Sequence, residues 1–579
     1  MTEHITMPIE LQRLPRHHTD ALFSVASGHE PLPMQRLPKA RVLWVNQRVM
    51  HDDPAFAACG ATRDKYAAWL LDQCAYELAS ADAGAAQTGA VADRYGGANI
   101  GHNGGSGRAA FINGYHVKGV GRTRLVSVLT DAAHASGGAY LEECVRETIF
   151  AELVAAEFPY GAVPTLAIIE TGAVQVWDTD HGPKHERCCL LVRPAFVRPA
   201  HFERAPGFIS TDPREGMRDA ERVRLSYQAG LQLWGGPALK NSYLDFWPRW
   251  ASQIAYAFAH RLPHAAYTSS NICLDGSLLD FGAMAAMPSW GQFTTSPGAP
   301  PTGLEFGLLV QALQLQTPFA ARHLDAELGT PESVTAIVNS AGQSYQHEMA
   351  REVLRVLGLT GKQALAVLAG PGQLATQLAL NRLVGHFQRD QLCIFEATPQ
   401  PRRDWDLAGF WDSEPRQHMA PLRHVLSGLL GLEGEGAAAA EAEALAARCK
   451  LRAKDRSELY RERFKEAVYA SLDGTLPGPL LTVDAVSNFI DSQVARQRRD
   501  GRAEPALAAP LGFARGPEAG YALFRCLHTG AAFALKEWEA GHDARLEEER
   551  LFLSHCAEDG MVFAATATAF RGAVALHAP

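Results

Sequence analysis

Hydrophobic positions recur every four residues in two early segments, residues 64–78 and 141–155. This spacing places them on one face of a helix. We therefore expect a packed helix over each segment, with the apolar face turned toward a core. The positions that form the two faces are Tyr66, Leu70, Cys74 and Leu78, and Leu141, Val145, Ile149 and Leu153.

The chain between these two helices is rich in glycine. Residues 94–121 bracket two short β-like runs, at 109–112 and 116–118. Glycine at this density is typical of loops whose backbone closely approaches another group. Two further β-like runs follow the second helix, at 165–170 and 188–192. The predicted order is a glycine loop, a strand containing Lys118, a helix containing Glu147, and two strands.

The remainder of the chain reads mainly as helix, with breakers rich in proline and glycine. We expect a loop at 264–271, a short strand at 277–281, a breaker at 296–303, a boundary at 398–404 and a linker at 502–520. The predicted helical segments are 244–261, 304–390, 436–447 and 457–469.

Charge and composition narrow the functional classes. The 579 residues include 54 Lys and Arg against 63 Asp and Glu, a net charge of −9, without long basic runs. This disfavours nucleic acids and anionic membranes as partners. No uncharged apolar stretch approaches the length of a membrane span, and the first residues are polar, so we expect a cytoplasmic protein. The ten cysteines include no C-x-x-C pair, which favours reduced thiols.

The glycine loop, Lys118 and Glu147 could together bind phosphate. Backbone amides in the loop would cradle phosphate oxygens, the lysine would neutralise them, and the glutamate would hold the lysine. The alternative is an ordinary structural loop, a surface lysine on a strand and an exposed carboxylate on a helix. The loop residues that we expect at the nucleotide are Gly105, Gly107 and Arg108.

A second group of polar residues lies near the middle of the chain. Asn271 precedes Asp280 by nine residues, and Asp280 opens the sequence Asp280-Phe281-Gly282. Hard cations such as Mg²⁺ prefer carboxylate and amide oxygens, and kinase-like folds use an Asn and an Asp-Phe-Gly aspartate in this order. We therefore predict that Asn271 and Asp280 hold Mg²⁺.

From Tyr95 to Gly282 the chain resembles the selenoprotein O family of kinase-like proteins. Six blocks occur in the family's order. Its glycine stretch YAGHQFG…GDGRA resembles residues 95–101 and 105–109, and its QLKGAG-T strand resembles residues 116–123. The blocks DGRAVLRSSIREFLxSE, GIPTTRALxLxxTG, RVAxSFxRFGxFE and HGVLNTDNMSILGLTIDYG resemble residues 136–152, 161–172, 191–203 and 264–282.

This resemblance implies roles for individual residues. Lys118 would bind nucleotide phosphates with Glu147 as its partner, and Arg198 and Arg193 would contact phosphate. The chain also departs from the family pattern. Ser270 stands where the family has its presumed general base, an aspartate, and Gly138 and Leu191 replace arginines. Asp275 is an alternative base, although it lies four residues after Asn271.

The resemblance also implies an α+β fold of the bilobal protein-kinase type. We expect an N-terminal extension at 1–85, a β-rich nucleotide-binding lobe at 86–200, a helical lobe with the metal-binding loop at 201–400, and a mostly helical extension at 401–579.

The implied activity is transfer of AMP from ATP, with Mg²⁺, to a protein or peptide acceptor. A kinase activity, an ATP-dependent enzyme that tailors a peptide, and a nucleotide-binding pseudoenzyme without a catalytic base remain open. The sequence does not indicate an oligomeric state. Zinc sites at His181, His185, Cys188 and Cys189, or at His260 and His264, are disfavoured because the first group runs into a buried strand and Pro263 interrupts the second.

Overall fold

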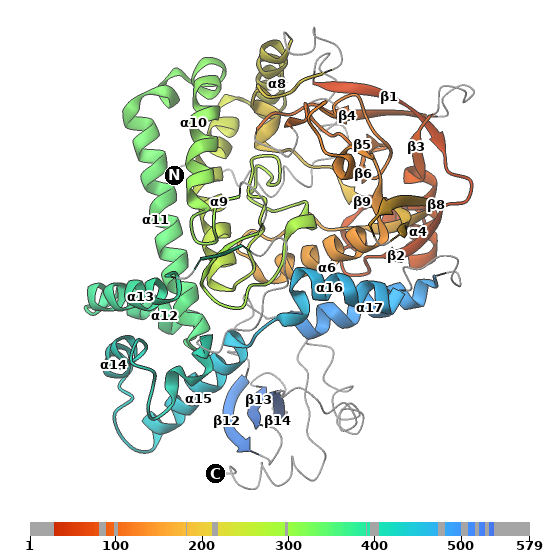
Figure 1. The fold of residues 1–579 in the computed structure, drawn as a ribbon. Helices are drawn as coiled ribbons and strands as arrows, with labels where there is room; N and C mark the ends of the chain where they lie inside the picture. The colour runs from red at the N-terminus through yellow and green to blue at the C-terminus, as the bar shows by residue number, and fades with distance from the viewer. Residues whose placement is uncertain are drawn as a thin grey trace.

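The structure is a computed structural model that combines α-helices with β-strands, which confirms the α+β class. A sheet lies on one side of the molecule and long helices lie on the other (Figure 1). The described residues are 28–79, 88–97, 102–180, 182–210, 218–295, 299–389, 391–393, 405–472, 481–498, 508–515, 520–526 and 532–537.

The N-terminal part of the chain forms a nine-stranded antiparallel sheet. Its path is β2-β8-β9-β6-β5-β4-β1-β3, and β7 pairs with β9. The predicted strands at 109–112 and 116–118 are confirmed as β5 and β6. The one at 165–170 begins two residues later, at Ala167, as part of the longer β8, and the one at 188–192 lies within the longer β9. The strands are β1 (His29–Arg36), β2 (Arg41–Val45), β3 (Tyr76–Leu78), β4 (Thr88–Asp93), β5 (Ala109–Ile112), β6 (Tyr115–Lys118), β7 (Ala139–Tyr140), β8 (Ala167–Thr179) and β9 (Gly182–Pro194).

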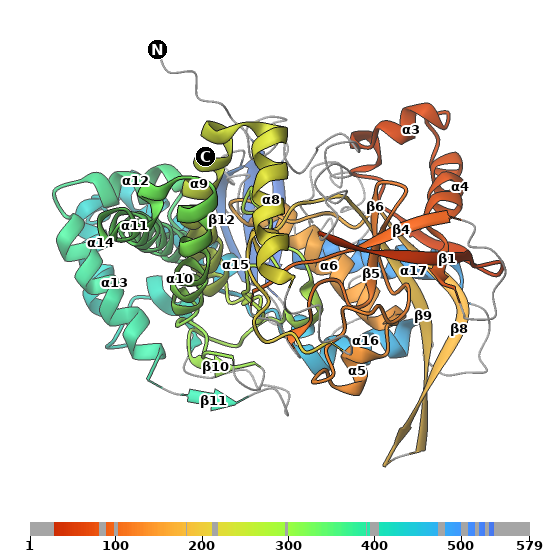
Figure 2. The ribbon, with the colours of Figure 1, turned by 90° about the horizontal axis from the view of Figure 1, so that it is seen from above.

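Strands β8 and β9 form a long hairpin whose outer part projects from the body of the molecule (Figure 2). Their pairing shifts register between Glu170 and Val174, which marks the point where the hairpin leaves the sheet. Tyr469 from the C-terminal part of the chain donates to Glu186 of β9 at 2.7 Å, so the hairpin is also held from outside the sheet.

The first predicted helix is shorter than expected. Helix α4 (Arg63–Cys74) follows the short α3 (Pro54–Ala58), and the hydroxyl of Thr62 caps α4 by accepting from the amide of Lys65. Tyr66, Leu70 and Cys74 are buried as predicted, but Leu78 does not continue the helix. It lies in β3 opposite Met34 of β1, because the chain leaves the helical conformation at Ala75 and pairs with the sheet edge.

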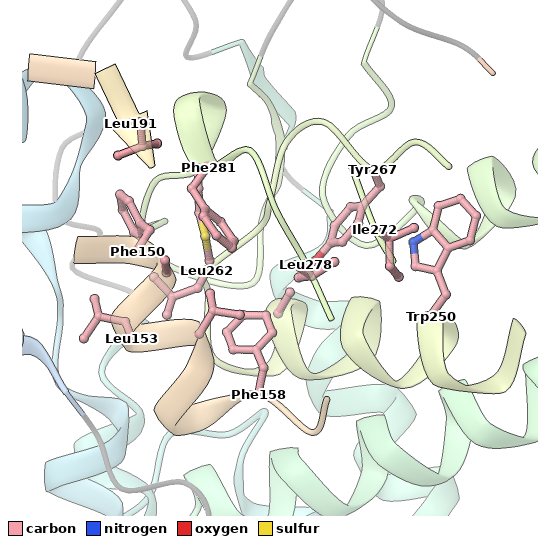
Figure 3. Close-up of a cluster of buried hydrophobic side chains, with 14 of the residues drawn as sticks. Phe150, Leu153, Phe158, Leu191, Trp250, Leu262, Tyr267, Ile272, Leu278 and Phe281 are labelled. Atoms are coloured by element: carbon pink, nitrogen blue, oxygen red, sulfur yellow. The ribbon is translucent and has the colours of Figure 1, made fainter. Parts of the chain in front are cut away.

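Helix α6 (Leu141–Glu157) is the second predicted helix and is buried on most of its surface. The four apolar positions of its pattern are all buried. Figure 3 shows Phe150 and Leu153 of this helix in one cluster with Phe281, which belongs to the loop after the helix α9 (Gly236–Ala259). This core fixes the loop that carries Asn271 and Asp280 against α6.

The same loop corrects one prediction. Residues 277–281 were expected to form a short strand, but Leu278 makes only isolated bridges, with Ala162 and Ile272. Asp280 adopts a left-handed conformation with φ 62°, which ends the extended path. The loop at 264–271 is confirmed, because it contains neither helix nor strand.

The middle of the chain is helical, as the sequence predicts for 244–261 and 304–390. Helices α9, α10 and α11 run side by side along one edge of the molecule (Figure 1). Two three-residue strands, β10 (Gln292–Thr294) and β11 (Gln391–Cys393), form a separate parallel pair. The α-helices whose bounds are given neither above nor in the next paragraph are α5 (Ala132–Ala135), α8 (Asp219–Trp234), α10 (Phe306–His323), α11 (Pro331–Val356), α12 (Gly361–Ala369), α13 (Gln373–Phe387), α14 (Ala420–Leu429) and α15 (Ala437–Ala453).

The C-terminal part returns to the sheet side of the molecule. Helices α16 (Arg461–Leu472) and α17 (Val483–Gln497) pack against α6 (Figure 1). The linker predicted at 502–520 is wrong where the structure describes it, because residues 508–515 form a strand in a three-stranded sheet. The predicted boundary at 398–404 lies outside the described residues. The three strands are β12 (Ala508–Arg515), β13 (Gly520–Cys526) and β14 (Ala532–Glu537).

Across the residues that the structure describes, none of the helices has the length and apolar character needed to span a bilayer.

Candidate active site

Lys118 lies at the end of β6 and is buried, with 4% of its surface exposed. Its Nζ lies 2.5 Å from Oε1 of Glu147, 2.9 Å from Oε1 of Glu143 and 3.0 Å from Oδ1 of Asp280. The alternative of a surface lysine and an exposed helical carboxylate is therefore wrong, because Glu147 is also fully buried. The structure brings together three of the regions that the sequence singled out.

Three cations form a row across neighbouring strands, and two carboxylates of α6 fill the gaps between them. Arg108 precedes β5, Lys118 ends β6 and Arg193 lies in β9. Glu147 accepts hydrogen bonds from Lys118 and Arg193. Glu143, one helical turn earlier, contacts Lys118 and accepts two bonds from Arg108, of 2.6 and 3.0 Å. Side chains four residues apart share a helix face, which explains this interleaving.

Neighbouring charges favour the ionised forms of Glu143, Lys118 and Asp280, whereas burial raises the pKa of Glu147 against the opposing effect of Lys118 and Arg193. Burial alone would raise the pKa of Glu143, but Arg108 and Lys118 outweigh it, so this pKa lies below its ordinary value. Burial and Arg108 act to lower the pKa of Lys118, but the carboxylates of Asp280, Glu143 and Glu147 outweigh them and raise it. Burial likewise opposes ionisation of Asp280, yet Lys118, Arg193 and Arg108 hold its pKa well below the usual range.

Asp280 points toward Lys118 because its neighbour anchors the backbone. The Phe281 ring is buried in the main core and lies 5.4 Å from the ring of His264. The left-handed conformation of Asp280 is rare for a residue other than glycine, so this anchoring holds a strained turn. The Asp280 side chain remains 38% exposed, which leaves it open to a ligand.

Asn271 lies beside Asp280 through the backbone. Its carbonyl accepts from the amide of Leu279, the residue before Asp280, at 3.1 Å. Its side-chain nitrogen donates to the carbonyl of Ala266 at 3.0 Å, which turns the amide oxygen away from that carbonyl. The pair thus offers a carboxylate and an amide oxygen from adjacent segments.

These two oxygens suit Mg²⁺, which takes few of its ligands from the protein, better than they suit a metal that the protein alone coordinates. No group of three or more His, Cys, Asp or Glu in the described part of the chain is arranged to hold a metal ion. Mg²⁺ is commonly held by one or two carboxylates, with the remaining positions filled by substrate phosphates and water. Asp280 and Asn271 would supply the protein oxygens, and the metal would neutralise phosphate charge when bound.

The glycine segment is held by close backbone packing. A Cβ on Gly105, which has φ +151°, would lie 2.2 Å from the carbonyl oxygen of Asp93, and one on Gly107 would lie 2.8 Å from Val126. Packing therefore requires glycine at 105, and a Cβ at 107 would require the Val126 side chain to move, whatever binds beside them. Residues 98–101, which belong to the same predicted glycine loop, lie outside the described residues.

Arg198 follows β9 and contacts the loop that carries Asn271. Its Nη1 donates to the carbonyl of Ser270 at 2.5 Å, and its guanidinium lies 4.5 Å from the centre of the Tyr95 ring. Its Nε lies 3.9 Å from Asp93, which His201 also contacts at 2.8 Å. Arg198 is buried and supports the loop before Asn271. These contacts of its side chain go to Ser270, Tyr95 and Asp93, none of which belongs to the cation row.

Ser270, at the position of the family's base, and Asp275, the alternative base, both make hydrogen bonds to other residues. The Ser270 hydroxyl lies 2.7 Å from that of Thr268. Asp275 accepts from the amide and the hydroxyl of Ser277, both at 2.8 Å, within its own turn. Burial raises the pKa of Asp275 to about 7, with the Ser277 hydrogen bonds opposing. The hydrogen bonds within its own turn therefore explain the position of the Asp275 carboxylate.

Two of the histidines considered as zinc ligands, His260 and His264, have structural partners. His260 contacts Glu352 at 2.8 Å, and His264 contacts the carbonyl of Leu279 at 2.9 Å. His185 belongs to the β8–β9 hairpin, and His181 lies outside the described residues.

Sequence reasoning missed Glu143 and Glu203. Glu143 lies four residues before Glu147 in a predicted helix, so its place on the same face was available from the spacing. Glu203 is buried and accepts from Ser269 at 2.8 Å and from Gln316. No local pattern signals it, because its partners are distant in the chain.

Compared with known proteins, the chain matches no protein family and no curated protein significantly.

Proposed function

We propose that the chain binds ATP with Mg²⁺ at this site and transfers AMP to a protein or peptide acceptor. The observation that carries the proposal is the buried contact of Lys118 with Glu147, at 2.5 Å, together with Asp280 at 3.0 Å. A strand lysine held by a helix glutamate, beside the aspartate of an Asp-Phe-Gly turn, is the arrangement that kinase-like folds use for phosphates.

The proposed roles follow from the chemistry of each group. Lys118, Arg108 and Arg193 would bind phosphate oxygens, and Asn271 and Asp280 would hold Mg²⁺. Arg198 would stabilise negative charge from the side of the 264–282 loop. The antiparallel sheet with α6 would form one lobe of a bilobal kinase-like fold, and helices α8 to α13 would form the other.

The resemblance to the selenoprotein O family favours transfer of AMP over transfer of phosphate. In that reaction an acceptor oxygen bonds to the α-phosphorus, the bond from phosphorus to the bridging oxygen breaks, and pyrophosphate leaves with the electron pair. The acceptor proton passes to water. Positioning and charge neutralisation provide most of the acceleration in such reactions, while a general base contributes about 10²–10⁴-fold.

A nucleotide-binding pseudoenzyme is the second candidate. The hydrogen bonds of Ser270 and Asp275 favour it, since neither side chain is placed to take a proton from an acceptor. Such a protein would bind ATP at the same site and would transfer nothing.

An experiment with labelled ATP distinguishes AMP transfer, phosphate transfer and nucleotide binding without transfer. The purified chain is incubated with Mg²⁺, a host lysate and ATP labelled at either the α- or the γ-phosphate. AMP transfer predicts that the α-label enters protein and that Lys118→Met abolishes this. Entry of the γ-label alone would indicate a kinase, and binding without transfer of either label would indicate a pseudoenzyme. Lys362→Met, which changes an exposed lysine of α12, is the matched control.

A further inference from the structure

Glu143 occupies two of the cations that would bind phosphate. Its Oε1 lies 2.6 Å from Nη2 of Arg108 and 2.9 Å from Nζ of Lys118, and its Oε2 lies 3.0 Å from Nη1 of Arg108. Arg108 also donates to the carbonyl of Gly138 at 2.9 Å. The glycine segment and the first turn of α6 are thereby joined through one carboxylate.

The charges in the row balance without a ligand. Three cations, Arg108, Lys118 and Arg193, face three carboxylates, Glu143, Glu147 and Asp280. The three carboxylates converge, because a Cβ placed on Gly282 would lie 3.6 to 3.8 Å from an oxygen of each. A polyphosphate can reach these cations only by replacing carboxylate contacts, since each cation already contacts at least one carboxylate.

The position of Glu143 makes it the carboxylate to be replaced. Glu147 is fully buried between Lys118 and Arg193 at the inner end of the row. The side chains of Glu143 and Arg108 keep 14% and 19% exposure at the outer end. Asp280 is assigned to the metal, so its negative charge is needed when nucleotide is present.

We propose that Glu143 is a latch that holds Arg108 and Lys118 in the nucleotide-free protein and is displaced by phosphate oxygens. The latch is a specificity-determining residue for the proposed ATP site and rests on that proposed function. It favours ligands with several adjacent phosphates, because only these reach both cations and replace all contacts of Glu143.

The latch has a measurable consequence for affinity. When a ligand displaces Glu143, the free energy of the contacts that Glu143 makes with Arg108 and Lys118 is lost. Removing the charge of Glu143 removes that loss. Glu143→Gln keeps the size of the side chain but weakens both ion pairs. We therefore expect this variant to bind Mg–ATP more tightly than the wild type, by about fivefold or more.

Calorimetric titration of the full chain with Mg–ATP tests this, with Glu142→Gln as the control. Glu142 precedes Glu143 in α6 and pairs with Arg146 instead of the cation row, so its variant should bind within about twofold of the wild type. In an Arg108→Met background, Glu143→Gln should gain less, because one of its two cations is gone. Thermal unfolding reports whether each variant is folded, and Glu143→Ser replaces Glu143→Gln if the latter is not.

Equal or weaker Mg–ATP binding by folded Glu143→Gln would overturn the latch while leaving the nucleotide site in place. If neither protein binds Mg–ATP, the proposed function fails, and inorganic tripolyphosphate then decides about the latch. Tighter tripolyphosphate binding by Glu143→Gln than by the wild type supports it. Equal binding, or none in either protein, overturns it.

Discussion

Oδ1 of Asp280 lies 3.0 Å from Nζ of Lys118 and joins two residues that are 162 positions apart in the chain. The contact connects the loop after α9 to the sheet, at the place where α6 contributes Glu147. It depends on the left-handed backbone of Asp280 and on the burial of Phe281. The same aspartate is therefore both the partner of the lysine and the proposed metal ligand.

Asp280→Asn should strongly reduce the dependence of ATP binding on Mg²⁺. The amide lacks the charge that attracts the metal, and we expect the gain in affinity from Mg²⁺ to fall by about tenfold or more. The measurement is ATP affinity with and without Mg²⁺. Asp275→Asn is the control, because that carboxylate is bound within its own turn by Ser277, and its Mg²⁺ dependence should match that of the wild type. An undiminished Mg²⁺ effect in Asp280→Asn would remove the metal assignment.

Glu203→Gln should stabilise the protein at alkaline pH and leave it unchanged near pH 5. Burial raises the pKa of Glu203 from 4.5 to about 7, with Ser269 and Gln316 opposing. Between these values the folded protein holds a proton that the unfolded chain releases, so the contribution of Glu203 to stability falls as pH rises. The full difference is about 3 kcal/mol above pH 7.

The measurement for Glu203 is chemical denaturation at pH 5 and pH 8. The hydroxyl of Ser269 can reverse its hydrogen bond to suit the amide, so geometry does not oppose the substitution. Glu433→Gln removes the same charge at an exposed position and should shift stability little at either pH. A loss of stability at pH 8 in Glu203→Gln would show that Glu203 is ionised and stabilising there.

Arg456→Met should destabilise the fold by about 3 kcal/mol. Arg456 lies before α16 and contacts Glu157, at the end of α6, at 2.7 Å, with both side chains buried. Removing one partner leaves a buried charge, so the double variant Arg456→Met and Glu157→Gln should recover part of the loss. Equilibrium denaturation gives the values. Arg496→Met breaks an exposed pair with Glu458 and should cost less than about 1 kcal/mol. Equal losses of stability in the two arginine variants would contradict the inference that Arg456 joins the C-terminal helices to α6.

Gly105→Ala should destabilise the protein by about 2 kcal/mol or more, because its Cβ would collide with the backbone of Asp93. Gly385→Ala should instead stabilise the folded protein. Gly385 lies within α13 with nothing within 4 Å of its Cβ, and alanine there favours the helix by about 0.5–1 kcal/mol. Thermal unfolding compares the two, and a tolerated alanine at 105 would refute the packing account of the glycine segment.

Local periodicity predicted much of the fold because it depends on short-range geometry. The four-residue pattern located α6 and with it Glu147, whose partner Lys118 ends the strand predicted from the β-like run at 116–118. The pattern failed at Leu78, where pairing with Met34 of a distant strand overrides the helical spacing. The contacts of Glu203 with Ser269 and Gln316 depend on tertiary packing, which one sequence does not reveal. Glu143 was missed for a different reason: its spacing from Glu147 was visible, but its pairing with Arg108 depends on how the glycine segment packs against α6.

Binding of Mg–ATP by the wild type and by Lys118→Met tests the central claim most directly. Lys118 makes the contacts that define the site, so we expect its loss to weaken Mg–ATP binding by about tenfold or more, while Lys362→Met binds like the wild type. Thermal unfolding confirms that both variants are folded. Equal Mg–ATP affinity in wild type and folded Lys118→Met would contradict the assignment of this site to nucleotide phosphates.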